Sequence, residues 1–107
     1  MINPHEHLQF IADNVEAFAK ADAKLTSLES FKNAIKAMEM ESSSQTSISG
    51  KEMEAYGSDA YRQWSNDYAN AKREFTALKL KIETAKLYIE VWRSQEASNR
   101  TTDKTLR

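Results

Sequence analysis

The sequence contains no cysteine in its 107 residues, which excludes disulfide bridges, zinc–thiolate sites and catalysis by a thiol. It has only two glycines and one proline, whereas a domain rich in β-strands needs turn residues about every 8–12 positions. It also lacks an apolar run of the roughly 18 residues that cross a membrane, and its N-terminus has no secretory-signal pattern. These absences predict a single all-α domain in the cytoplasm, without membrane contact.

Neither sign of charge dominates the sequence. The 15 Lys and Arg residues nearly balance the 16 Asp and Glu residues, for a formal net charge of −1. Such a balance argues against a dedicated binder of polyanions. The charges are nevertheless spread unevenly, because acidic residues prevail in 1–57 and basic residues prevail in 58–107.

A first helix is predicted over residues 4–41. Asn3 suits the N-cap, Pro4 suits the first helical position, and Glu6 lies three residues after the cap, as in a capping box. Apolar residues then recur at steps of three and four. They are Leu8, Ile11, Val15, Phe18, Leu25, Leu28, Ile35 and Met38. A serine-rich loop is expected over 42–50, followed by a short turn over 51–57 that ends at Gly57.

A second helix is predicted over residues 58–97, capped by Ser58 or Asp59. Apolar residues occupy ten consecutive a and d positions of a heptad repeat, which is the strongest pattern in the sequence. They are Tyr61, Trp64, Tyr68, Ala71, Phe75, Leu78, Ile82, Ala85, Ile89 and Trp92. The remaining residues, 98–107, form a polar tail that is expected to be flexible.

The two helices are expected to form an antiparallel hairpin, because only a short loop connects them. One alignment matches the two apolar stripes along their whole length and places Ile35 opposite Trp64. Asp22 interrupts the first stripe, and we expect it to form a polar layer with Lys79 or Lys81.

A hairpin leaves a second apolar stripe of the second helix uncovered, on the side opposite its a/d seam. This stripe consists of Leu80, Leu87 and Val91, with Thr84 between them and Tyr88 alongside. Because exposed apolar stripes usually mark an interface, we expect a homo-oligomer that forms a four-helix or larger bundle. A different protein partner, or scattered surface hydrophobes with no partner, are the alternatives.

No group of residues in the sequence suits catalysis, a metal ion or a cofactor. His5 and His7 flank Glu6, but their spacing directs them to different sides of a helix, so we expect both to face solvent. Asp22 has no nucleophile or second acid near it in the sequence, and no glycine-rich phosphate loop occurs. We therefore expect a protein that is not an enzyme and carries no cofactor.

The second helix also has a basic face formed by Lys72, Lys79, Lys86, Arg93 and Arg100. The three lysines repeat every seven residues and so share one side of the helix, where they could follow a phosphate backbone. Glutamates on the same helix dilute this charge, and such a mixture is typical of a solvated helix face. Contact with nucleic acid or with an acidic partner therefore stands as an alternative.

Two stretches of the second helix are distinctive. They are Ser58-Asp59-Ala60-Tyr61-Arg62 and Ile89-Glu90-Val91-Trp92-Arg93-Ser94-Gln95-Glu96-Ala97-Ser98-Asn99-Arg100. They resemble a family of small, mostly uncharacterised bacteriophage and prophage proteins that are commonly encoded near single-strand-annealing recombination genes. The family has no established catalytic residues.

This resemblance implies a phage protein in the cytoplasm of a bacterial host cell. Its expected role is that of an accessory factor in phage DNA recombination, acting through protein contacts. The alternative is a phage inhibitor of a host nuclease or antiviral defence complex that acts by direct binding.

Overall fold

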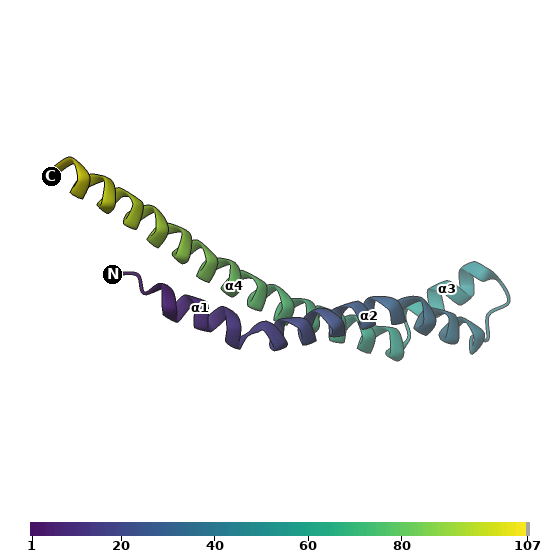
Figure 1. The fold of residues 1–107 in the computed structure, drawn as a ribbon. Coiled ribbons are helices and arrows are strands. Elements are labelled where there is room, and N and C mark those ends of the chain that lie inside the picture. Colours follow the sequence, from purple (N-terminus) through teal and green to yellow (C-terminus); the bar gives the residue numbers. More distant parts are fainter. Residues whose placement is uncertain (107) are drawn as a thin grey trace. The chain divides into compact units, whose positions relative to one another are not determined.

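The computed structural model describes residues 1–106, with side chains described through residue 104. Four helices follow one another along the chain: α1 (Pro4–Asp13), α2 (Val15–Glu41), α3 (Ile48–Tyr56) and α4 (Asp59–Leu106) (Figure 1). No strand occurs in this part of the chain, so the all-α prediction is confirmed.

The predicted helix over 4–41 is wrong in one respect, because Asn14 divides it into α1 and α2. The side-chain amide of Asn14 donates to the Phe10 carbonyl at 2.8 Å, which is the acceptor that its own backbone N–H would use in an α-helix. That N–H donates instead to the Ile11 carbonyl at 3.2 Å. The competition of an amide side chain with the backbone explains the break.

The predicted loop over 42–50 and turn over 51–57 also differ from the structure, because α3 begins earlier, at Ile48. Ser47 is its N-cap, and the Ser47 hydroxyl accepts a hydrogen bond from the Gly50 N–H at 3.0 Å. A serine cap offsets the weak helix propensity of the residues after it. The helix ends before Gly57, as the sequence predicted.

Helix α4 begins where the sequence predicted and ends later. The Tyr61 N–H donates to the Ser58 hydroxyl at 3.2 Å, which makes Ser58 the N-cap. The helix continues past Ala97 to Leu106, so the expected flexible tail over 98–107 is wrong for these residues; Arg107 lies outside the described residues. No glycine or proline follows Ala97 to end the helix.

The chain divides into two compact units, which we describe separately. The terminal unit joins Met1–Phe18 to the part of α4 from Thr76 on, and the central unit is Ala19–Phe75. In each unit the segment that precedes α3 runs in the direction opposite to α4. Their contacts show this direction, because a rising residue number in the first segment meets a falling number in α4.

In the terminal unit, α1 packs against the heptad seam of α4. Ala85 is buried and the other a and d residues of this part of α4 are half-buried. Opposite this seam, Ile11 and Phe18 of the predicted stripe are half-buried, whereas Leu8 of α1 and Val15 at the start of α2 are exposed. His7 and Phe10 of α1 are half-buried as well. The buried face of α1 therefore keeps Ile11 but takes in His7 and Phe10 in place of Leu8.

In the central unit, aromatic side chains of α4 pack on α2. The Trp64 indole N–H donates to the Leu28 carbonyl at 2.7 Å, and the Lys32 ammonium lies 5.8 Å from the centre of the Trp64 ring. Trp64 thus meets residues one to two helical turns before Ile35, the predicted partner. Tyr56, Tyr61, Trp64 and Tyr68 form a ladder in which successive ring centres are 5.1, 5.4 and 5.3 Å apart.

Candidate interaction surfaces

The apolar stripe of α4, which we define as Leu80, Thr84, Leu87 and Val91, lies in the terminal unit. Its three large apolar side chains keep much of their surface in water, with 55% of Leu80, 65% of Leu87 and 47% of Val91 exposed. These residues occupy the f and c positions of the heptad, so they point away from the seam. The stripe is an apolar surface that the described part of the chain leaves largely open to solvent.

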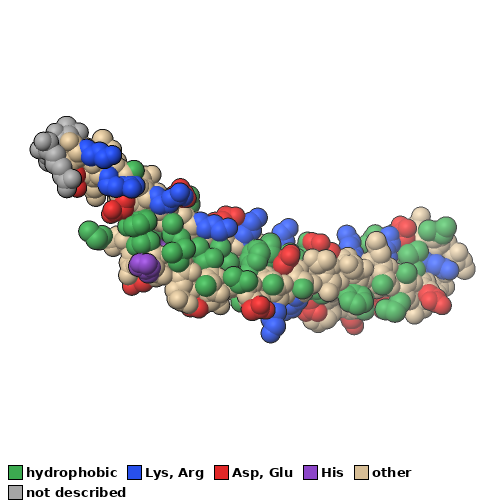
Figure 2. Space-filling view, in the orientation of Figure 1, with side chains coloured by type: hydrophobic (Ala, Val, Ile, Leu, Met, Phe, Trp, Pro, Cys, Tyr) green, Lys and Arg blue, Asp and Glu red, His purple; other side chains and the backbone are tan. Residues whose placement is uncertain are grey.

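An apolar groove borders the stripe on the side of α1. Phe10 and His7 of α1 line it together with Leu80, Thr84 and Tyr88 of α4. The His7 and Tyr88 rings stack, with centres 4.6 Å apart and planes 10° from parallel. In Figure 2, hydrophobic side chains gather beside the purple histidine. The groove and the stripe together make a broader apolar surface than α4 provides alone.

The expectation that both histidines face solvent is therefore wrong for His7. His5 is exposed, but His7 is half-buried because it stacks on Tyr88. The apolar pattern places Tyr88 beside the second stripe but gives no indication that α1 contacts this ring. The signal for it was weak, since His7 lies one residue outside the predicted apolar stripe and has a polar ring.

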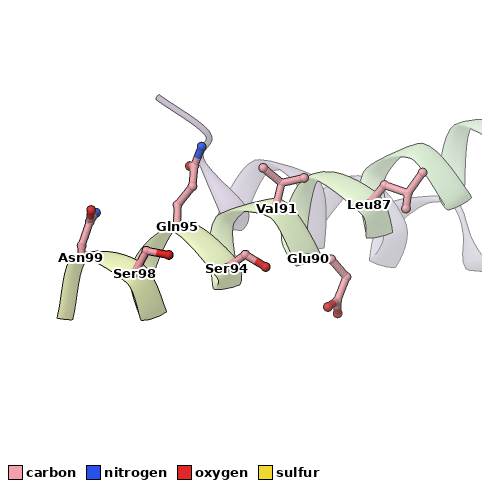
Figure 3. A pocket seen from close by; sticks show the side chains of 7 residues that line it. All are labelled: Leu87, Glu90, Val91, Ser94, Gln95, Ser98 and Asn99. Carbon is pink, nitrogen blue, oxygen red and sulfur yellow. The ribbon is translucent and has the colours of Figure 1, made fainter. Parts of the chain in front are cut away.

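Beyond the stripe, α4 presents small polar side chains. Figure 3 shows a shallow pocket whose lining residues all come from α4. Leu87 and Val91 begin it, and Ser94 and Ser98 continue the same f and c positions toward the C-terminal end. The surface therefore changes along one side of the helix from apolar to small and polar.

The basic face of α4 extends over both units, and its members differ in their surroundings. In the central unit, the Lys72 ammonium lies 6.0 Å from the centre of the Tyr68 ring. In the terminal unit, Arg93 forms a salt bridge with Glu90 at 3.0 Å. Among the described residues, Lys79, Lys86 and Arg100 form no salt bridge. These three cations are available to an external anion.

Asp22 does not lie in the buried seam where the polar layer was expected. It is exposed, while its neighbours Ala21 and Leu25 are half-buried. It belongs to the central unit, whereas Lys79 and Lys81 belong to the terminal unit, so the pairing with either lysine stays a prediction. Its carboxylate lies just off the buried side of α2 and stays hydrated, which removes the desolvation cost of a buried charge.

The charged residues of the central unit hold its elements to one another. Lys24 and Glu74 form a salt bridge at 3.8 Å between α2 and α4, and Lys36 and Glu52 form one at 3.8 Å between α2 and α3. A hydrogen bond to Tyr56, together with the Glu52 carboxylate, raises the pKa of Lys36 above its ordinary value. The Lys24–Glu74 pair is exposed and so orients the helices more than it stabilises them, whereas the Lys36–Glu52 pair is half-buried.

No group of three or more His, Cys, Asp and Glu residues in the described part of the chain is arranged to hold a metal ion. None of the described helices is both long and apolar enough to cross a membrane. Comparison of the chain with protein-family models, curated proteins and solved structures gives no match.

Proposed function

We propose that this protein acts by binding other proteins and not by catalysis, and that one of its partners is a second copy of itself. The exposed apolar stripe of α4 carries the proposal. Three large apolar side chains along one side of a helix favour burial, at about 1.5–3 kcal/mol for each side chain fully removed from water. In this proposal the helices form an antiparallel hairpin whose copies assemble into a four-helix bundle.

The exposed apolar surface of the terminal unit supports this assembly. Leu80, Leu87 and Val91 keep 55%, 65% and 47% of their surface in water, and the groove lined by Phe10 and Tyr88 adjoins them. A stable dimer typically buries about 800 Å² on each partner. The stripe and the groove together offer a contiguous apolar face for such an interface.

The test is a double substitution in the stripe, Leu80→Lys with Leu87→Lys. Light scattering of the wild-type protein is expected to give at least a dimer at micromolar concentration, and the double variant a monomer that stays helical by circular dichroism. The matched control is Leu8→Lys with Val15→Lys, because these residues are similarly exposed in the same unit but lie on other helices. A wild type that is monomeric at high micromolar concentration contradicts self-association.

We further propose that these contacts serve phage DNA recombination, on the basis of the resemblance carried by Ser58–Arg62 and Ile89–Arg100. The direct test mixes the purified protein with a single-strand-annealing recombination protein and, separately, with a host exonuclease complex. A complex with the first supports the accessory role. A complex with the second, accompanied by loss of nuclease activity, supports the alternative role of a host-defence inhibitor.

Nucleic-acid binding is a second candidate function, favoured by the three unpaired cations Lys79, Lys86 and Arg100. If these and Arg93 each contact a phosphate, the logarithm of the DNA association constant should fall with the logarithm of salt concentration with a slope of about −3.6. Fluorescence anisotropy with a labelled duplex measures this slope. Changing all four residues to glutamine should abolish binding, whereas the Leu80→Lys, Leu87→Lys variant should retain it.

A further inference from the structure

The terminal unit has a second groove, which lies on the other flank of α4 and has an apolar floor. Val15 in this floor keeps 54% of its surface exposed, although it belongs to the predicted apolar stripe of the first helix. The volume of the groove is about 310 Å³, at the lower end of the range for ligand sites, which suits a few side chains of a partner. The floor consists of Ile11, Val15, Phe18 and Ile82.

Lys79 and Lys86 border this groove, which we call the lysine groove, one on either side of Ile82 along α4. They lie about 10.5 Å apart along the helix axis, at 1.5 Å per residue. Both are exposed, and neither forms a salt bridge among the described residues. Arg93, the next cation on this side of the helix, is already paired with Glu90 at 3.0 Å. The groove therefore has an apolar middle between two available positive charges.

Glu83 adds one negative charge to the edge of the lysine groove, between the two lysines. It is exposed and forms no salt bridge within the described residues. Phosphates recur about every 3.4 Å along one DNA strand, so a strand that contacted both lysines would also bring phosphates beside the Glu83 carboxylate. Repulsion there disfavours a continuous polyanion. A ligand with two separate anionic groups at the ends avoids this cost.

An amphipathic helix can present this pattern of charge and apolar surface. Two acidic residues seven positions apart share one side of a helix and are also about 10.5 Å apart along its axis. Apolar residues three and four positions after the first acid lie between them on the same side. A helix of this kind places one carboxylate at Lys79, one at Lys86 and its apolar side chains over Val15 and Ile82. Docking of an apolar helix side in a groove is a common mode of peptide recognition.

We propose that the lysine groove binds an acidic amphipathic helix of a partner protein, with one carboxylate at Lys79 and one at Lys86. The charge complementarity between the two lysines and such a helix carries the inference. The inference rests on the proposed function, which is the binding of other proteins, and adds the chemistry of a partner. The lysine groove shares no residue with the apolar stripe of α4, so this binding and self-association use different surfaces.

The first experiment uses a labelled peptide as the probe and the full chain as the receptor. The peptide is built on alanine and glutamine and stapled on its far side to keep it helical. It carries two glutamates seven positions apart, with leucines three and four positions after the first. Fluorescence anisotropy at low salt should show saturable binding. Two control peptides, one with glutamines in place of the glutamates and one with glutamates four positions apart, should bind more weakly.

The second experiment removes the two positive charges of the groove. Lys79→Gln with Lys86→Gln should weaken binding of the peptide about tenfold at low salt, because two exposed ion pairs are lost. Lys81→Gln with Lys104→Gln is the matched control, since it removes the same charge from α4 outside the groove. This control should leave the dissociation constant nearly unchanged. All four lysines are exposed, so both double variants should keep the helical circular dichroism of the wild type.

The third experiment tests the role of Glu83 in selecting the partner. A peptide with a third glutamate midway between the other two should bind the wild type more weakly than the parent peptide, because the added carboxylate lies beside Glu83. Glu83→Gln should remove most of this difference. Glu96→Gln makes the same charge change outside the groove and should preserve it. This result separates a bound helix in the groove from a general attraction by net charge.

The outcomes separate this inference from the proposal beneath it. A wild type that self-associates but does not bind the peptide, or that binds it equally after loss of Lys79 and Lys86, overturns the acidic-helix site and leaves self-association intact. A labelled DNA duplex that displaces the peptide and binds the groove lysines more tightly overturns the site in favour of nucleic acid. A wild type that neither self-associates nor binds the peptide overturns both. Binding that persists in Leu80→Lys, Leu87→Lys supports a groove independent of the stripe.

Discussion

Individual residues decide where the helices of this protein touch. Within the central unit, the Trp64 indole reaches across to the Leu28 carbonyl. Within the terminal unit, the contact of His7 with Tyr88 has the same effect, because two flat rings 4.6 Å apart must lie at the same level of their helices. Hydrogen bonds and stacked rings require a particular geometry. They therefore favour one alignment of the two helices where apolar contacts alone would allow several.

At this scale we predict that His7→Ala destabilises the protein, by about 0.5–1.5 kcal/mol, because it removes a stacked aromatic pair. Thermal unfolding followed by circular dichroism measures the change. His5→Ala is the matched control and should unfold like the wild type, since His5 is exposed. Equal stability of the two variants would show that the stacking contributes nothing.

The elements are bounded by side chains that bind the backbone. Ser47 starts α3 and Ser58 starts α4 by accepting backbone N–H groups. Asn14 instead ends a helix, because its side-chain amide donates to the Phe10 carbonyl at the end of α1. Short polar side chains therefore set helix boundaries in a chain that has few glycines and prolines to do so.

At the scale of the element we predict that Ser47→Ala weakens α3, at a cost of about 1 kcal/mol, which is typical for loss of an N-cap. Hydrogen exchange of the amides at the start of α3, above all that of Gly50, should become faster. Ser49→Ala is the control, because Ser49 is exposed and makes no hydrogen bond among the described residues. Unchanged exchange at Gly50 in Ser47→Ala would contradict the capping role.

The whole molecule buries little of its apolar surface by itself. Among the described residues only three are buried, and all three are alanines: Ala55, Ala71 and Ala85. Small residues at these places let helix backbones approach closely, but they supply little apolar area. Larger side chains in the seams remain half-buried. A partner that covered the rest would stabilise the folded chain further by mass action.

At the scale of the whole molecule we predict a midpoint of thermal unfolding that rises with protein concentration, because association stabilises the folded state by mass action. Calorimetry over a hundredfold range of concentration measures the effect. The Leu80→Lys, Leu87→Lys variant should have a lower midpoint that does not depend on concentration. A midpoint of the wild type that is also independent of concentration would mean that folding and association are uncoupled.

The sequence by itself determined the helical class and the buried side of α4. All ten predicted a and d residues, from Tyr61 to Trp92, are half-buried or buried, because a strict heptad repeat leaves one side of a helix free of charge. It also determined the apolar stripe of the candidate interface, since Leu80, Leu87 and Val91 are outside that repeat and are exposed.

Only the tertiary structure decided the register and the buried side of α1. Stripes with steps of three and four match again after a shift of one heptad, or about two helical turns, so periodicity does not choose between Leu28 and Ile35 as the neighbour of Trp64. The Trp64 indole N–H needs an acceptor, and it donates to the Leu28 carbonyl, which places Trp64 beside Leu28. In α1, His7 stacks on Tyr88, so that His7 and Phe10 are half-buried while Leu8 is exposed. Contacts between side chains far apart in the sequence have no local pattern, so their geometry emerges only when the helices pack.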